Sequence, residues 1–291
     1  MALELDDRQR AMLQEMGVRV WLPGTAFALA PDATPPARPP AATPAASPVA
    51  ARVATPPAPA APAAMATPDG SMPQVASLDW AALRDTAAAC KACGLCAGRK
   101  NTALQPPLHE QGWQGQAHWM VVGDQPDEDE DAAGSAFADA SGALLTNMLK
   151  AIKMVRINDG AQASSAASRA AVPPQNAAYV TNVVKCRAPH GAVPQAADLA
   201  QCAAYLQREI ALVQPKMILA MGRFANQLLL SETPELVNLP LGKLRGTVYR
   251  YQGVPVVVTY HPKTLMRNSA DKAKAWADLC LAADTVDALA G

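Results

Sequence analysis

Aromatic and charged residues are both scarce in this chain of 291 residues. Aromatic side chains make up 4% of it and charged side chains 17%, and 25 Lys and Arg balance 25 Asp and Glu, so the formal net charge is zero. A protein with this balance does not bind nucleic acid through bulk positive charge, although it can still carry a local basic face. No apolar run approaches the roughly 18 to 20 residues that a membrane helix needs. The first residues also lack the basic and apolar stretches of a secretory signal, so we expect a cytoplasmic protein.

Six cysteines are present, and in a reducing compartment they are expected as thiols or metal ligands rather than disulfides. Cys90 and Cys93 form a C-x2-C pair, whereas Cys186 and Cys202 lie 16 positions apart. Four thiolates can hold a 4Fe–4S cluster or a zinc ion, but zinc ribbons usually use two short pairs. Spacing alone does not decide between Cys90/Cys93 and Cys93/Cys96. It also leaves open that Cys186 and Cys202 are buried core thiols.

Proline and alanine dominate the region before residue 78. Residues 31–68 hold 12 of the 26 prolines and 15 alanines. Proline at this density prevents helical hydrogen bonding, and alanine buries too little surface to offset the entropy of ordering, so residues 23–77 are predicted to be a disordered linker. Residues 1–22 are predicted to form a short helix that docks on a partner or on the main domain. Its apolar residues near helical spacing are Met12, Leu13, Met16 and Val20.

Residues 78–291 alternate short apolar runs with amphipathic patterns, and they are long enough for one substantial core. Strands are predicted at 118–122, 178–184, 217–221, 247–251 and 254–260. Helices are predicted at 143–152, 198–213, 223–230 and 271–289. This alternation predicts an α/β domain with a parallel sheet covered on both faces.

Polar residues or glycine mark the ends of three predicted strands. Gly123 follows the first strand, Asn182 lies in the second and His261 follows the last. Ligands of open α/β sheets bind beyond the carboxyl ends of the strands. A single polar residue there often only caps a turn, but three that converge indicate a pocket.

Seven segments of residues 78–291 resemble, in their order along the chain, the iron–sulfur, type 4 uracil-DNA glycosylases. They are CKACGLCAGR (90–99), GDQPDEDEDAAGSAF (123–137), SGALLTNML (141–149), YVTNVVKCRAP (179–189), PKMILAMGRFA (215–225), LRG (244–246) and TYHPKTLMR (259–267). The resemblance covers essentially the whole region. It implies a three-layer α/β/α sandwich around a mostly parallel four-stranded sheet.

The resemblance implies a hydrolase of base-excision repair. Such an enzyme cleaves the N-glycosidic bond of uracil in single- or double-stranded DNA, which releases uracil and leaves an abasic site. It also implies a 4Fe–4S cluster, bound by Cys90, Cys93, Cys186 and Cys202. We expect a monomer whose partner is uracil-containing DNA.

The same resemblance implies the roles of individual side chains. Asn182 reads the polar edge of uracil, Phe137 stacks on the extruded base, and His261 hydrogen-bonds the uracil carbonyl while negative charge grows there. Gly123 opens the loop that binds uracil and activates water. A glycosylase must extrude the nucleotide from the stack to reach its bond, so these residues would line a closed pocket.

Two acids are candidates for orienting the attacking water and favouring the sugar cation, namely Asp124, which stands where the family has glutamate, and Glu130. Basic residues also gather in the sequence after His261, despite the zero net charge of the chain. The residues expected to contact DNA are Arg187, Lys263 and Arg267.

The chain departs from the family's pattern in the loop that follows Gly123. Asp127 and Asp139 stand where the family has glycine, and six acids fall within residues 124–131. Acids are unusual on a surface that faces DNA phosphates, and this stretch reads as an acidic loop. These departures favour an alternative hypothesis: a catalytically weak or inactive member that binds uracil-containing or single-stranded DNA, or a repair partner.

Overall fold

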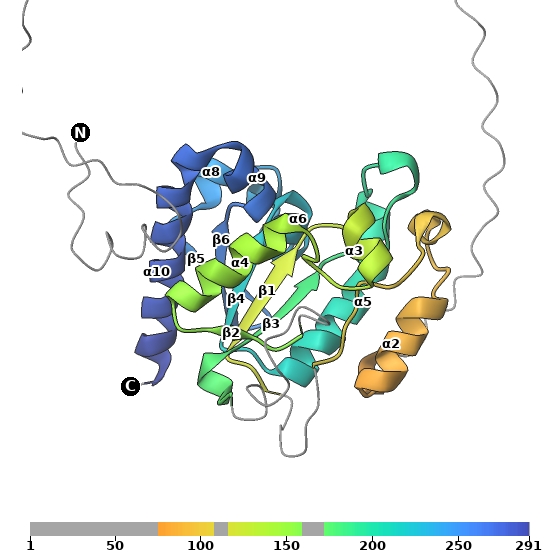
Figure 1. Ribbon diagram of the computed structural model, residues 1–291, viewed down its shortest axis with the longest axis horizontal. Helices are drawn as coiled ribbons and strands as arrows, with labels where there is room; N and C mark the ends of the chain where they lie inside the picture. Colours follow the sequence, from red (N-terminus) through yellow and green to blue (C-terminus); the bar gives the residue numbers. More distant parts are fainter. Residues whose placement is uncertain (1–74, 108–115, 159–171, 291) are drawn as a thin grey trace, which may run out of the picture. The chain divides into compact units, whose positions relative to one another are not determined.

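The computed structural model describes residues 75–107, 116–158 and 172–290 (Figure 1). The helix expected in residues 1–22 and nearly all of the linker expected in residues 23–77 lie outside these ranges. The described part begins at Val75, which is buried in the core next to helix α5. Residues 75–77, which the sequence assigns to the linker, form a short 3-10 helix. None of the described helices is long and apolar enough to cross a membrane.

One sheet runs through the described domain, with six strands in the order β2-β3-β1-β4-β6-β5. The strands are β1 Trp119–Gly123, β2 Val155–Arg156, β3 Ala177–Asn182, β4 Met217–Met221, β5 Val248–Tyr251 and β6 Val254–Thr259. All neighbouring pairs are parallel except β5 and β6. The expected mostly parallel sheet is confirmed, but the strand number of four is wrong, because an edge strand flanks the four central strands on each side.

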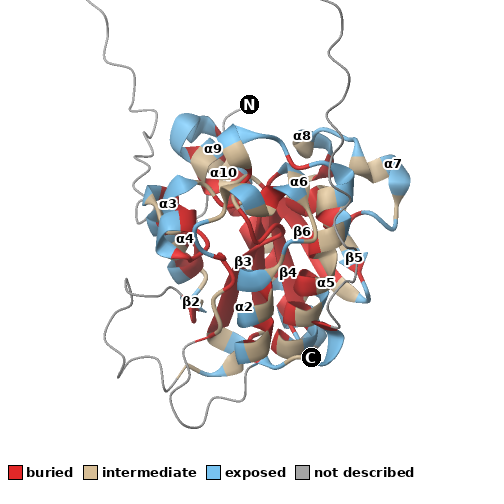
Figure 2. Ribbon diagram, turned by 90° about the vertical axis from the view of Figure 1, so that its right-hand side faces the viewer, coloured by how far each residue is buried: buried red, intermediate tan, exposed pale blue. Residues whose placement is uncertain are grey.

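Helices cover both faces of the sheet and complete the expected three layers (Figures 1 and 2). Helices α2, α5 and α6 pack on one face, and α4, α9 and α10 pack on the other. The α-helices are α2 Trp80–Ala89, α3 Glu128–Ala133, α4 Ala140–Ala151, α5 Ala196–Val213, α6 Arg223–Leu229, α7 Pro234–Val237, α8 Leu241–Leu244, α9 Pro262–Arg267 and α10 Lys272–Ala290. The 3-10 helices are η1 Val75–Ser77, η2 Gly94–Gly98, η5 Pro174–Asn176, η6 Pro189–Gly191 and η7 Ser269–Asp271.

Strands β1, β3 and β4 are buried along their whole length, as the red ribbons of Figure 2 show. Alternate side chains of a strand point to opposite faces. Trp119 and Val121 of β1 thus enter the core under α4 and α10, while Met120 and Val122 enter the core under α2 and α5. Because both faces are covered, these strands appear in the sequence as continuous apolar runs.

The acidic stretch is a short helix, α3, rather than the loop that its composition indicates. Asp127 caps its N-terminus by accepting the backbone N–H of Glu130, whose own side chain accepts the N–H of Asp127. Carboxylates in the first turn interact favourably with the positive end of the helix dipole. The helix ends at Gly134, whose φ of 64° suits glycine. The acids are therefore used largely to build a helix terminus.

Candidate active site

The first site residues meet at the carboxyl edge of the sheet. Gly123 ends β1 and Asn182 ends β3, and the two residues are direct partners in the parallel register. A Cβ atom on Gly123 would lie 2.6 Å from Asn182 Oδ1 and 2.6 Å from Phe137 Cζ. Only glycine at position 123 therefore lets the amide and the aromatic ring approach the strand end together.

Phe137 lies in the connection between α3 and α4 with its backbone in the left-handed region, at a φ of 50°. Arg156 Nη1 donates to its carbonyl oxygen at 3.3 Å, and Glu130 accepts its N–H. A side chain on Gly142 would collide with that carbonyl oxygen. These contacts hold a strained backbone that otherwise costs about 1–3 kcal/mol. The buried ring lies nearly parallel to the imidazole of His261, with centroids 4.9 Å apart and planes at 14°.

Glu130 is 2% exposed and joins three parts of the site. Its Oε1 accepts hydrogen bonds from Asn182 Nδ2, at 3.2 Å, and from the N–H of Phe137, while Oε2 accepts the N–H of Asp127 at 2.8 Å. Burial raises the pKa of this carboxyl, and the backbone hydrogen bonds oppose that shift. Both oxygens are thus committed within the protein, and the amide of Asn182 is held in one orientation.

His261 follows β6 and caps helix α9. Its Nδ1 accepts the backbone N–H of Lys263 at 3.2 Å, so the ring proton of the neutral imidazole is on Nε2. Burial lowers the pKa of His261 to about 4, with the charge of Lys263 acting in the same direction and Asp139 and Asp127 opposing it. At neutral pH the side chain is therefore a neutral hydrogen-bond donor.

The side chain of Lys263 lies among three carboxylates. It forms an ion pair with Asp127, and its Nζ lies 3.6 Å from Asp139 Oδ2 and 3.8 Å from Glu130 Oε2. Burial alone would lower the pKa of Lys263, but the hydrogen bond from its ammonium to Asp127 and the other carboxylates raise it. The sequence predicts that Lys263 contacts DNA, whereas the structure pairs it with acids of the same site.

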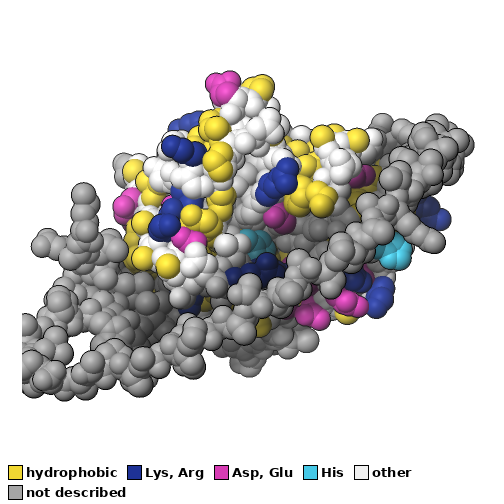
Figure 3. Space-filling view, turned by 90° about the horizontal axis from the view of Figure 1, so that it is seen from above, with side chains coloured by type: hydrophobic (Ala, Val, Ile, Leu, Met, Phe, Trp, Pro, Cys, Tyr) yellow, Lys and Arg dark blue, Asp and Glu magenta, His cyan; other side chains and the backbone are white. Residues whose placement is uncertain are grey.

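The other two residues expected to contact DNA lie on the surface. Arg187 pairs with the exposed Glu128 at 3.4 Å, and Arg267 is exposed in the last turn of α9. Viewed onto this edge, Lys and Arg side chains flank a histidine near the centre of the face (Figure 3). A chain of zero net charge thus presents cations beside the site.

Asp124 follows Gly123 and points towards the next strand end. Its carboxylate accepts the backbone N–H groups of Arg223, Phe224 and Ala225, at 3.1, 2.7 and 3.1 Å. Burial raises its pKa, and these hydrogen bonds oppose the shift. Gly222, with a φ of 118°, leaves the space that the carboxylate fills. Asp124 thus caps helix α6 from a distance of about a hundred residues in sequence.

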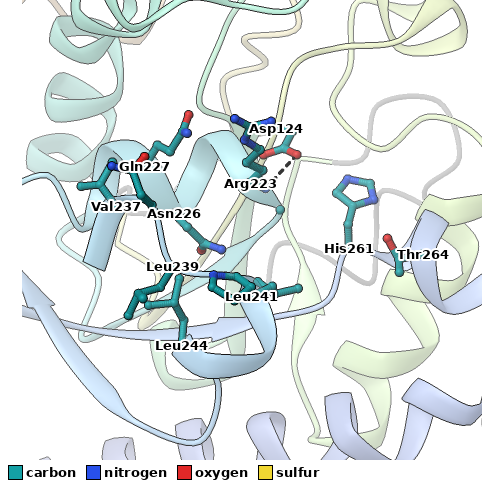
Figure 4. A pocket seen from close by; sticks show the side chains of 13 residues that line it. Asp124, Arg223, Asn226, Gln227, Val237, Leu239, Leu241, Leu244, His261 and Thr264 are labelled. Carbon is teal, nitrogen blue, oxygen red and sulfur yellow. Dashed lines mark hydrogen bonds between the residues drawn. The ribbon is translucent and has the colours of Figure 1, made fainter. Parts of the chain in front are cut away.

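A cavity of about 460 Å³ opens between Asp124 and His261 on one side and α6 and α8 on the other (Figure 4). Leucines of residues 239–244 form an apolar side, while Arg223, Asn226 and Thr264 supply polar groups. Asn226 Oδ1 is buried and has no hydrogen-bond partner among the described residues. The cavity is large enough for a sugar or a heterocyclic base.

The cysteines gather on the other side of β3. Cys186 and Cys202 are buried in the core, and Cys90 and Cys93 pack against it. Burial, and to a lesser degree the nearby thiols, raise the pKa of Cys93 to about 11 and that of Cys202 to about 12. Cys96 is also close enough to act on Cys186, so the choice within the first pair stays open.

No three candidate ligands within the described ranges surround a single point closely enough for one metal ion. The thiols lie close enough to act on one another electrostatically. Arg99 Nη1, at 3.1 Å from Cys186 Sγ, places a positive charge beside the group, which suits thiolate ligands. Four such thiols are a donor set of the kind that thiolate-ligated metal groups use.

Several supporting residues escape sequence reasoning. Lys185 is buried, pairs with Glu209 at 2.5 Å and donates to the carbonyl oxygen of Asn182 at 2.6 Å, which fixes the strand end that carries the amide. Arg156 supports Phe137 in a similar way. The signal in the sequence that could have pointed to Lys185 is a lysine directly after a strand of apolar residues, in the motif TNVVKC, where a buried charge needs a partner.

Comparison with known proteins gives a consistent result. Residues 110–280 match the family model of the uracil DNA glycosylase superfamily. A type-4 uracil-DNA glycosylase of Sulfurisphaera tokodaii is 30% identical over 190 residues, which are 64% of this chain and 75% of that protein. The type-4 uracil-DNA glycosylases of Archaeoglobus fulgidus and Pyrobaculum aerophilum are 30% and 31% identical, over 52% and 56% of this chain and 67% and 74% of their own lengths.

Proposed function

The chain belongs to the uracil DNA glycosylase superfamily and groups with its type-4 members, and from this premise we propose that it excises uracil from DNA by hydrolysing the N-glycosidic bond. The observation that carries this proposal is the junction of Asn182, Glu130 and Phe137 over Gly123. It combines an oriented amide with an aromatic face at one buried strand end.

Base selection follows from the orientation of Asn182. Glu130 uses one N–H of the amide, so the other N–H is available to donate to uracil O4 while Oδ1 accepts from N3–H. Cytosine presents a donor and an acceptor in the reverse order. Turning the amide to match it would bring Oδ1 against the carboxylate of Glu130, and this repulsion opposes cytosine.

Stabilisation of the leaving base falls to His261. Cleavage places negative charge on uracil, and the Nε2–H of a neutral, half-buried imidazole can donate to the carbonyl oxygen where that charge develops. Such a preorganised donor lowers the barrier by about 3 to 4 kcal/mol, or 10² to 10³ in rate. His261 also lines the cavity of Figure 4, so the leaving base and the cavity share a wall.

The cavity is the proposed place of the deoxyribose and the attacking water. Of the two candidate acids, Asp124 lines this cavity and Glu130 does not. Each oxygen of Asp124 accepts from backbone N–H groups, yet a carboxylate offers about four lone-pair sites, so it can still accept a proton from water. We therefore assign orientation of the water, and stabilisation of the sugar cation, to Asp124.

Relatives named type-4 uracil-DNA glycosylases support an iron–sulfur protein. We propose Cys90, Cys93, Cys186 and Cys202 as the ligands of a 4Fe–4S cluster. When bound, the cluster supplies a covalent cross-link between distant segments. Cys90 and Cys93 lie in the turn after α2, Cys202 lies in α5, and Cys186 follows β3, four residues after Asn182. Binding by all four would therefore tie these segments together next to Asn182. Uracil-containing DNA is the proposed partner, and we propose a monomer that acts on it in the cytoplasm.

The two departures from the family's pattern have structural explanations. Asp127 caps α3, Asp139 caps α4, and both pair with Lys263. Asp127 and Asp139 are thus engaged by helix termini and by Lys263, which weakens the part of the inactive-member hypothesis that rests on these two positions. Glu128 and Asp129 of the acidic stretch remain exposed.

Release of uracil from an end-labelled oligonucleotide tests the function. Purified protein should release uracil from single- and double-stranded substrates and should leave an oligonucleotide with thymine in place of uracil intact. Asp124→Asn should lower the single-turnover rate about 10²-fold or more, with DNA binding little changed. If wild-type protein binds the oligonucleotide but releases no uracil, the function proposed here is wrong.

A further inference from the structure

Lys263 is surrounded by carboxylates from two separate segments. Asp127 and Glu130 come from the N-terminus of α3, and Asp139 is the N-cap of α4. The ammonium group contacts all three within 4.0 Å, and the Lys263 side chain is 31% exposed. A partly exposed ion pair normally contributes little to folding stability, so a role in positioning other residues has to be considered.

The backbone of Lys263 contacts the imidazole ring of His261. Its N–H donates to Nδ1 of His261 and fixes the tautomer of the imidazole. Its side chain meanwhile pairs with Asp127 and lies near Asp139. These two acids flank Phe137 in the sequence, since Phe137 follows Asp127 by ten residues and precedes Asp139 by two. One residue thus links the segment that presents the imidazole to the segment that presents the phenyl ring.

Neither ring lies in regular structure at that point, and the contacts of Arg156 and Glu130 with the Phe137 backbone do not tie it to the segment of His261. Phe137 sits in the left-handed region between two helices, and His261 precedes the first turn of α9. Their stacking at 4.9 Å requires the two segments to keep a fixed separation. The ion pairs cross that gap directly.

We propose that Lys263 is a positioning residue that holds Phe137 against His261 through Asp127 and Asp139. The proposal rests on the proposed function, because the two rings are those assigned to uracil. It also gives a reason for two acids at positions where the resemblance leads one to expect glycine. Together with the lysine they form one unit, which we call the clasp (Lys263, Asp127 and Asp139).

Loss of the clasp should affect chemistry more than binding. A displacement of about 1 Å at reacting groups can cost 10²-fold in rate. A phosphate contact behaves differently, since its loss weakens binding and lowers the log–log salt slope by about 1. If Lys263 is a positioning residue, its loss lowers the rate and leaves the salt slope unchanged. If Lys263 is a phosphate contact, its loss lowers the salt slope and leaves the rate of the chemical step unchanged.

Three changes test the clasp. Lys263→Met removes the charge and keeps most of the stem, Lys263→Arg keeps the charge, and the double variant Asp127→Asn with Asp139→Asn removes the partners. Arg267→Ala, in the same helix, is the matched control for a phosphate contact. Single-turnover rates and DNA dissociation constants are measured across a range of salt concentrations, with thermal unfolding as a check on folding.

We expect Lys263→Met to slow uracil release 10- to 100-fold with an unchanged salt slope, and Lys263→Arg to restore most of the rate. The double variant should be slowed similarly, and adding Lys263→Met to it should have little further effect. An unchanged rate with a salt slope reduced by about 1 in Lys263→Met would overturn the proposal, and Arg267→Ala calibrates the slope change that a lost phosphate contact produces.

A second readout does not depend on activity. The ring current of Phe137 shifts the NMR signals of the His261 imidazole, and with 4 histidines in the chain the signal is assigned from a His261→Gln spectrum. Lys263→Met should move that signal towards its unstacked position, and Arg267→Ala should not. An unmoved signal refutes the clasp even if the protein releases no uracil, so the two proposals fail separately.

Discussion

Glu130 accepts a hydrogen bond from the side-chain amide of Asn182 at 3.2 Å, across 52 positions of sequence. The carboxylate therefore fixes the orientation of the amide. The amide alone offers a donor and an acceptor in either order, and the buried carboxylate selects one of them. In the proposed function, specificity for the base thus belongs to Asn182 and Glu130 together.

Glu130→Gln tests this pair directly. The new amide can donate to Asn182 Oδ1, so the two orientations of Asn182 become closer in energy. Uracil release should fall about 10²-fold, and the ratio of rates for uracil and cytosine should narrow. Unfolding stability should drop by about 1–3 kcal/mol, because the N–H groups of Phe137 and Asp127 compete for one remaining acceptor.

Glu128→Gln is the control, since Glu128 lies in the same helix with its side chain exposed and pairs with Arg187. It should change neither the rate nor the base preference. Single-turnover assays on matched uracil and cytosine oligonucleotides give both quantities. An unchanged uracil-to-cytosine ratio in Glu130→Gln would show that Asn182 is oriented by something else.

His261→Ala should slow uracil release by about 10² to 10³, because the leaving base loses a donor aimed at its carbonyl oxygen. Affinity for uracil-containing DNA should stay within a few-fold of wild type. His261→Gln, which keeps a donor of similar reach, should recover part of the rate. A chemical step within about threefold of wild type in His261→Ala would mean that the histidine only caps α9.

The same histidine should make stability depend on pH. Its pKa is about 4 in the folded protein against 6.5 for an ordinary imidazole, owing to burial and the charge of Lys263. Between these values the unfolded state binds more protons, so folding stability falls as the pH is lowered through this window, by up to about 3 kcal/mol. Urea unfolding at pH 7 and pH 4.5 measures the change, and His261→Gln should lose less stability than wild type. Equal losses in both proteins would contradict a depressed pKa.

The cysteine ligands are tested by metal analysis. The purified protein should be brown and contain about four iron atoms per chain, as a 4Fe–4S cluster requires. Cys186→Ser should lose the iron and unfold more easily, because ligand binding is coupled to folding. Cys280→Ser, in α10, should keep it. Comparing Cys90→Ser with Cys96→Ser decides the first pair, and stoichiometric zinc without iron would exclude the cluster.

Much of the fold can be read from the sequence because burial on both faces leaves a strong signal. Strand β4 spans residues 217–221, as predicted. The prediction succeeds because the apolar run of this strand stops at Gly222. Strand β2 has two residues and leaves no pattern that could be recognised. Helix α3 is missed for another reason: its acids resemble a solvated loop, and their roles as cap and ion-pair partners depend on residues far away in the chain.

The site divides in the same way. Gly123, Asn182 and His261 are found from sequence because parallel strands bring their carboxyl ends to one edge. Lys263 is assigned to DNA from sequence because its partner Asp127 is 136 positions away. The sequence alone shows a cation after His261, which predicts a phosphate contact, and it cannot show the carboxylates that surround Lys263.

Gly222 and Asp124 have a consequence for how this chain can vary. The carboxylate of Asp124 occupies the volume that a Cβ at position 222 would need, and the three N–H groups behind that glycine hold the carboxylate there. The two positions therefore constrain each other: a side chain at 222 would collide with the carboxylate, and a longer acid at 124 would have to move the start of α6 or give up its backbone hydrogen bonds. Asp124→Glu is accordingly expected to be a disruptive change in this chain.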